Sequence, residues 1–266
     1  MNGELAALIA VVLHGNAWLA DISQPPPALD RDNTTFRYVH SLTFVERRQG
    51  LRRRARRIEG TAEWLVAQQN AGVERLTLCS PTAACDQLEP HLASGFANGG
   101  PRGLVTNGAA RTLWSSGWDT DGGEHPRGEI WQVTMTSLAL ATLDHEPAPA
   151  VPEASAQLMA SLEDARVFAI ANDLAGWADW FAKASNAAHA SEPQVAYNPD
   201  IAPPGWLTLE QHQLLAAAVQ AWVFGGMGSW NVVWLSDESQ ADRMARVTER
   251  LYAAVVGAVI AVTNGP

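Results

Sequence analysis

The hydrophobic positions divide the chain into two parts. Residues 1–145 mix strand-like and helical patterns, whereas residues 152–262 show helical spacing almost throughout. Between them lies the stretch LDHEPAPAVPEA, whose closely spaced prolines cannot continue the interior of a strand or a helix. We therefore predict a mixed part over residues 1–146 and a helical part over residues 147–266, packed together as one compact unit.

The first part predicts a small sheet flanked by helices. Alternation is clearest in 129–143, where Ile130, Gln132, Thr134 and Thr136 alternate with Trp131, Val133, Met135 and Ser137. Ser80-Pro81 is typical of the start of a short helix. The remaining predicted elements are helices over 4–20 and 51–70 and strands over 34–46, 73–79 and 103–108.

The second part predicts three helices. The first runs from about Pro152 to Ala188, and the next starts at Thr208, which forms a capping-box pattern with Gln211 and leads a helix to Val223. The third covers 239–262, with an apolar face at Met244, Val247, Leu251, Val255, Val259 and Val262. Together the two parts predict an α+β fold, with a small sheet and helices packed on a mainly helical C-terminal part.

The segment 222–234, WVFGGMGSWNVVW, contains three of the eleven tryptophans and three glycines. It lacks the lysine of a P-loop, so it is not a phosphate-binding loop of that kind. A dinucleotide fingerprint follows a strand, whereas this segment follows a helical pattern. Gly225 or Gly226 is expected to end the helix, and Gly228 to allow a second tight turn or a close approach of the backbone. We expect the three tryptophans to face the interior.

The same segment also has the composition of a pocket wall, because small-molecule sites combine apolar aromatic walls with few polar groups. Gly228, Ser229 and Asn231 are then the residues left to contact a ligand or a partner. Trp222, Trp230 and Trp234 would line the wall, with Trp114, Trp118 or Trp131 of the first part as further candidates.

The acidic residues of the turn-like segment GWDTDGGEH favour a turn over a metal site. Its residues Asp119, Asp121, Glu124 and His125 follow no recognised ligand spacing, and Asp-Gly-Gly before a strand is ordinary turn chemistry. The chain also contains no G-x-S-x-G and no H-E-x-x-H. We therefore predict neither a bound metal nor a cofactor.

The net charge of −10 is unevenly distributed. Between Glu46 and Glu59, seven arginines against two glutamates give +5, which leaves −15 on the rest of the chain. An acidic protein is repelled by nucleic acid, so a basic partner or a cationic ligand is expected instead. The arginine run is interpreted as a solvated face or an ion-pair network, with a binding patch as the alternative.

Several features indicate a cytoplasmic protein without membrane attachment. The apolar run Leu5–Leu13 follows Glu4 rather than positive charge, unlike a signal peptide, and the later apolar runs are interrupted or too short to span. Cys79 and Cys85 follow neither a disulfide framework nor a zinc spacing. Cys79 precedes the predicted helix start at Ser80, where a thiol can be activated, but a structural cysteine is favoured.

Two functions remain after these exclusions. The first is a non-catalytic binding protein that engages a basic partner, in the manner of an inhibitor or an immunity protein. The alternative is an enzyme or a binder of a small apolar ligand, with a tryptophan-lined pocket around residues 222–234.

Overall fold

The computed structural model describes residues 1–47, 55–79, 89–98, 103–109, 111–123, 125, 128–139, 148–225 and 228–265. Within this range the chain has an α+β fold, as predicted. The helices are α1 (Gly3–Ala20), α2 (Thr61–Asn70), α3 (Pro90–Ala93), α4 (Val151–Ala171), α5 (Ala175–Ala187), α6 (Leu209–Gln220) and α7 (Glu238–Asn264), with 3-10 turns η1 (Thr34–Phe36) and η2 (Trp230–Val232). The strands are β1 (Val39–Glu46), β2 (Arg56–Glu59), β3 (Val73–Cys79), β4 (Gly103–Gly108), β5 (Thr112–Thr120) and β6 (Trp131–Ala139).

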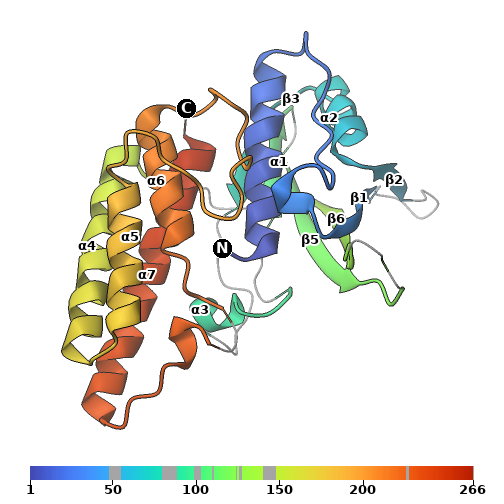
Figure 1. Cartoon of the computed structure of the whole chain (residues 1–266). Helices are drawn as coiled ribbons and strands as arrows, with labels where there is room; N and C mark the ends of the chain where they lie inside the picture. The colour runs from blue at the N-terminus through green and yellow to red at the C-terminus, as the bar shows by residue number, and fades with distance from the viewer. Residues whose placement is uncertain are drawn as a thin grey trace.

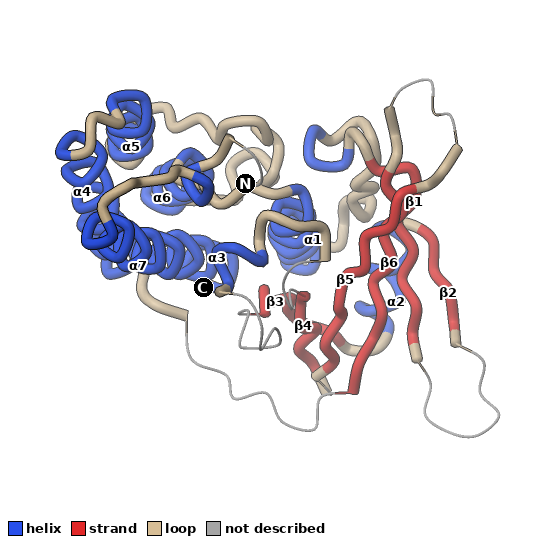
Figure 2. The backbone as a smooth tube through the Cα atoms, turned by 90° about the horizontal axis from the view of Figure 1, so that it is seen from below, coloured by secondary structure: helices blue, strands red, loops and turns tan. Residues whose placement is uncertain are grey.

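The six strands form one mixed sheet in the order β2-β1-β6-β5-β4-β3. Strands β3 to β6 form an antiparallel meander, β1 and β2 form a hairpin, and β1 joins β6 in parallel. Figure 2 shows α1 between the sheet and the group formed by α4 to α7. Helix α1 contacts β3 and β4, and α2 connects the two outer strands.

Alternate side chains along each strand lie on the same face of the sheet, and one of the two faces is covered. Phe44, Met135 and Trp114 are buried, and Phe44 stacks on Trp64 of α2 with ring centroids 4.3 Å apart. Trp114 meets Trp64 edge to face. The alternation predicted for 129–143 is confirmed in β6, where Val133, Met135 and Ser137 are buried, while residues 140–143 lie outside the described range.

Helix α1 is a core helix along most of its length. It is the one described helix long and apolar enough to cross a membrane, and 67% of that segment is buried inside the protein. Its N-cap Asn2 accepts from the Leu5 N–H, as expected for a helix start. Buried residues of both sequence parts join in one hydrophobic cluster, whereas the boundary predicted at residue 146 lies outside the described range and stays a prediction.

The outer edge of β3 is closed by two asparagine side chains. Asn16 of α1 accepts from the Leu76 N–H at 2.7 Å and donates to the Leu76 carbonyl at 2.9 Å. Asn264 of α7 forms the same pair of bonds with Leu78, at 2.7 and 2.8 Å. Each amide thus takes the place of a neighbouring strand and pairs backbone groups that an edge would leave exposed.

The predicted helix over 51–70 is wrong in its first half. Residues 56–59 form β2, and Ile58 is paired with Phe44 of β1. Gly60 has φ of +73°, which turns the chain before α2 begins at Thr61. The exposed Arg56 and Arg57 therefore stand on an edge strand and not in the first turns of a helix, where they would oppose the helix dipole.

Two further boundaries differ from the prediction. The strand expected over 34–46 begins at Val39, because Asn33 caps the turn η1 by accepting from the Thr35 N–H. Strand β5 was not predicted, since its sequence TLWSSGWDT is rich in small polar residues that are typical of turns. The helix start predicted at Ser80-Pro81 and the cysteine Cys85 lie outside the described residues.

The helix predicted from Pro152 to Ala188 is two helices. Asp173 adopts a left-handed φ of +57°, and Asn172 ends α4 with its side chain donating to the Phe168 carbonyl. The capping box of Thr208 and Gln211 is confirmed, but α6 ends at Gln220, before the glycines. The buried face predicted for the last helix is confirmed in α7.

Candidate metal centre

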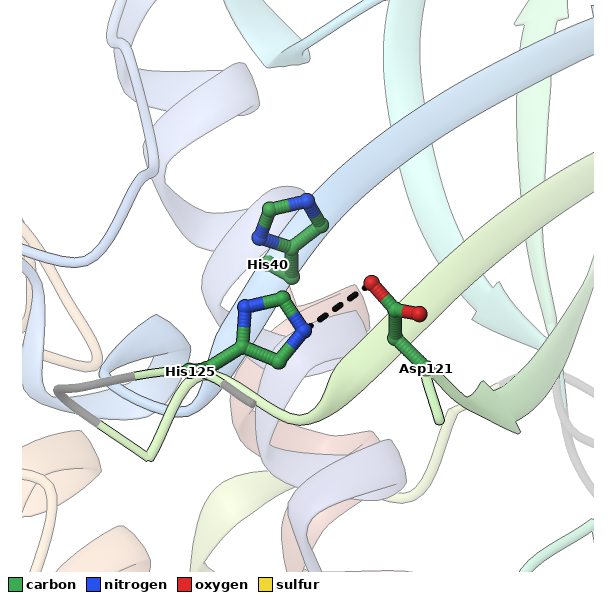
Figure 3. A group of neighbouring side chains, drawn as sticks. All are labelled: His40, Asp121 and His125. Atoms are coloured by element: carbon green, nitrogen blue, oxygen red, sulfur yellow. Dashed lines mark hydrogen bonds and ion pairs between the residues drawn. The ribbon is translucent and has the colours of Figure 1, made fainter. Parts of the chain in front are cut away.

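Two histidines and an aspartate gather at the end of the sheet where β5 turns into β6. Asp121 directly follows β5, His125 lies in the turn, and His40 is the second residue of β1. They meet because β6 pairs with both β5 and β1, so that Trp131 is paired with Thr120 on one side and with Val39 on the other. Figure 3 shows the three side chains pointing toward one another.

The three side chains are close enough to share one ion. One ligand atom from each residue lies within 4.8 Å of the others. His125 Nε2 is 2.9 Å from Asp121 Oδ2, and the His40 and His125 ring centroids are 4.5 Å apart. A tetrahedral zinc site with bonds of about 2.0–2.2 Å places its ligand atoms about 3.3–3.6 Å apart, so small side-chain movements suffice.

Hydrogen bonds keep the Asp121 carboxylate ionised and fixed in position, as an anionic metal ligand must be. The backbone N–H of Gly123 donates to its Oδ1 at 3.3 Å, and this bond is the largest cause that lowers the pKa of Asp121. Hydrogen bonds from Gln132 and His125 lower the pKa further, against the opposing effect of burial. The group is therefore ionised at neutral pH, and its geometry is fixed by its own turn.

The cluster is open to solvent on one side. His40 is exposed, whereas the side chains of Asp121 and His125 are 29% and 14% exposed. Three protein ligands on an accessible surface leave coordination positions for water or another molecule, as in catalytic zinc sites and in two-histidine, one-carboxylate iron sites.

No protein-family model matches this chain, and no curated protein or solved structure is significantly similar to it. The chemistry of the site therefore rests on its own geometry.

Two of the three tryptophans of segment 222–234 belong to the interior. Trp230 is fully buried, its indole N–H donates to Thr248 Oγ1 at 2.7 Å, and it packs edge to face on Phe181. Trp222 is buried against Phe224 with centroids 5.3 Å apart. The prediction that Trp234 faces the interior is wrong, because its side chain is 83% exposed.

The polar residues of that segment are mostly engaged by their own chain. Gly228 has φ of +80°, which confirms the tight turn, and Ser229 Oγ donates to the Gly225 carbonyl. Asn231 donates to the His91 carbonyl at 3.0 Å and lines a small cavity of about 250 Å³. Contact of these residues with a ligand or partner stays a prediction.

Two sequence interpretations change once the site is assembled. The segment 117–125 supplies Asp121 and His125, as the metal alternative required, but Asp119 is not in the cluster and Glu124 lies outside the described residues. His40 was missed, because it is 81 residues away from Asp121 and only sheet pairing brings it near. Burial raises the pKa of the Cys79 thiol, which fits a structural cysteine.

Proposed function

We propose that this protein binds one divalent transition-metal ion through His40, Asp121 and His125, and that the open positions of the ion take water or a substrate. The observation that supports the proposal is the convergence of two imidazoles and one ionised carboxylate within 4.8 Å. Imidazole-containing sites favour Zn²⁺, Fe²⁺ and Co²⁺ over Mg²⁺ or Ca²⁺, which prefer oxygen ligands alone.

The proposal includes a chemical role. A divalent ion with a free position polarises a bound carbonyl or phosphoryl group and lowers the pKa of bound water. Within the cluster, Asp121 keeps a negative charge beside the ion and the Gly123 N–H holds the carboxylate in place. Such a centre supports hydrolytic chemistry or ligand binding at the surface of the sheet.

Titration of the metal-free protein with Co²⁺ tests this proposal. Visible d–d absorption reports the coordination, and displacement by Zn²⁺ reports the relative affinity. His125→Ala and Asp121→Asn are expected to weaken binding by at least roughly a hundred-fold, because the first removes one of three ligands and the second removes the negative charge of another. His189→Ala, at an exposed histidine outside the cluster, is the matched control and is expected to bind as the unmodified protein does.

Equal Co²⁺ affinity in His125→Ala and in His189→Ala would show that the cluster is not the binding site. Lower affinity in His40→Ala is needed as well, since that histidine comes from a different strand. Binding lost only in Asp121→Asn would point to a carboxylate site without histidine ligands.

The charge of the helical part supports a second proposal, a basic partner. Residues 147–266 contain twelve acidic residues against five basic ones, a net charge of −7. Polylysine binding that is strong at low salt and absent at high salt is expected, because exposed charges are screened over about 10 Å at 0.1 M salt. Binding unaffected by salt would contradict this proposal.

A further inference from the structure

A groove of about 720 Å³ lies away from the metal centre, where the end of α1, the start of α6 and the end of α7 meet. Figure 1 shows the end of α1 and the marked C-terminus at the same end of the molecule, away from the β5–β6 turn. The volume is in the range of small-molecule sites. The apolar part of the lining consists of Leu13, Leu19, Val151, Trp206, Leu207 and Val262.

The charged lining favours a cation. Glu74 and Glu210 both line the groove, and no ion pair joins either carboxylate to another described residue. Both are exposed, so they can reorient toward a bound molecule. Two carboxylates beside an apolar surface match a ligand with one positively charged group on an apolar body.

The one guanidinium of the described groove lining is directed at the protein itself. Arg75 Nη2 donates to the Asn264 carbonyl at 2.8 Å and to the Gly265 carbonyl. These carbonyls belong to the C-terminal end of α7, where the helix dipole places partial negative charge. The positive charge of Arg75 is therefore offset by the helix end, which weakens the case for an anionic ligand.

Trp206 adds another contact for a cation. Its side chain is 39% exposed and lines the groove. An indole face attracts ammonium groups, more strongly where water is partly excluded.

We propose that this groove binds a small molecule that carries a protonated amine on an apolar chain or ring. The apolar body contacts Leu19, Leu207 and Val262, and the ammonium lies between Trp206 and the two glutamates. The site is independent of the metal centre.

Calorimetric titration with three probes of equal chain length tests the charge preference: n-octylammonium, n-octanol and n-octanoate. The expected order of affinity is octylammonium, then octanol, then octanoate. The double variant Glu74→Gln, Glu210→Gln is expected to weaken octylammonium binding by roughly ten-fold and to leave octanol binding unchanged, since exposed charge pairs contribute modestly each.

Two further variants place the binding in the groove. Ala20→Trp adds a bulky side chain at an exposed position of the lining and is expected to abolish binding of octylammonium and octanol alike. Glu192→Gln, an exposed glutamate outside the lining, is the matched control and should bind all three probes as the unmodified protein does. An unchanged unfolding midpoint verifies that each variant is folded.

Three results would overturn the proposal. Octanoate binding as tightly as octylammonium would assign the groove to anions through Arg75. Equal affinity for all three probes would show an apolar groove without charge selection. Undiminished binding in Ala20→Trp would place the ligand elsewhere.

Discussion

In the segment around Trp230 and in the turn around Asp121, the amino-acid composition indicates the role of the region to very different extents. The Trp230 segment is rich in tryptophan and glycine, and Trp230 itself is held by the protein's own core. The Asp121 turn has the composition of an ordinary acidic turn, yet it brings two ligand groups beside a histidine from another strand. Unusual composition thus identified a packing centre, while common residues brought together by sheet pairing formed the candidate site.

The difference has an energetic basis. A buried aromatic side chain contributes through the area that it removes from water and through a satisfied N–H. The partly exposed polar groups of the Asp121 turn contribute less to folding than a buried aromatic side chain, and their arrangement is available for binding. Substitutions around Trp230 should therefore change stability more than binding, and substitutions around Asp121 should change binding more than stability.

Trp230→Ala is expected to cause the largest loss of stability, about 3–5 kcal/mol, because it opens a cavity among Phe168, Trp177 and Phe181. It also leaves Thr248 without its indole partner. Denaturant unfolding measures the change. A loss below about 1 kcal/mol would mean that Trp230 is not a core residue, which would reopen its role in a pocket.

Zn²⁺ is expected to stabilise the protein by about 2.7 kcal/mol at a free concentration of about one hundred times its dissociation constant. The reason is that the three ligands converge only in the folded chain. Unfolding curves with and without Zn²⁺ measure the effect. His125→Ala should lose this stabilisation, whereas its metal-free stability should fall by about 0.5–1.5 kcal/mol, the contribution of one hydrogen bond to Asp121. Equal stabilisation of that variant by Zn²⁺ would contradict the site.

Asn264→Ala is expected to cost about 1–3 kcal/mol, because it leaves the Leu78 N–H and carbonyl without their side-chain partner. Asn264→Asp should lose at least as much, since its second carboxylate oxygen would face the Leu78 carbonyl, another acceptor, at a helix end that carries partial negative charge. Denaturant unfolding ranks the two variants. A smaller loss in Asn264→Asp would show that the bond from the Leu78 N–H outweighs both repulsive effects.

His14 makes the pH dependence of stability testable. Burial lowers its pKa below 6.5, against the opposing effect of Asp200, whose carbonyl is 3.0 Å from His14 Nε2. Protonation therefore favours the unfolded chain: the contribution of neutral His14 is complete above about pH 6.5 and is lost as pH falls through the lowered folded-state pKa. His14→Gln should flatten the stability profile below pH 6.5, and an unchanged slope in that variant would show that His14 does not cause it.

Trp234→Ala gives the smallest expected effect, within about 0.5 kcal/mol, because its side chain is 83% exposed. It is the natural control for Trp230→Ala, since the same residue type is removed four positions away. The difference between the free energies of unfolding of the two variants measures how much burial of a tryptophan contributes to stability. A large loss in Trp234→Ala would show that this exposed side chain is covered by a partner or by another copy of the chain.

Much of the fold could be predicted from periodicity, and most of the candidate site could not. The buried face of α7 and the alternation in β6 are local patterns, which the sequence displays directly. The strand Arg56–Glu59 was predicted wrongly because its arginines fit an exposed helix as well as an edge strand. His40 could be added to the cluster only through the parallel pairing of β1 with β6, a contact that no local pattern encodes.

The amide pair that closes β3 has a consequence for the growing chain. Leu78 and its partner Asn264 are 186 positions apart. The strand edge at Leu78 therefore stays unpaired until the chain has been translated as far as Asn264. At about 5–20 residues per second, that interval is roughly ten to forty seconds. During this time Asn16 can already protect Leu76, whereas the edge at Leu78 is open to pairing with other nascent chains on the same polysome.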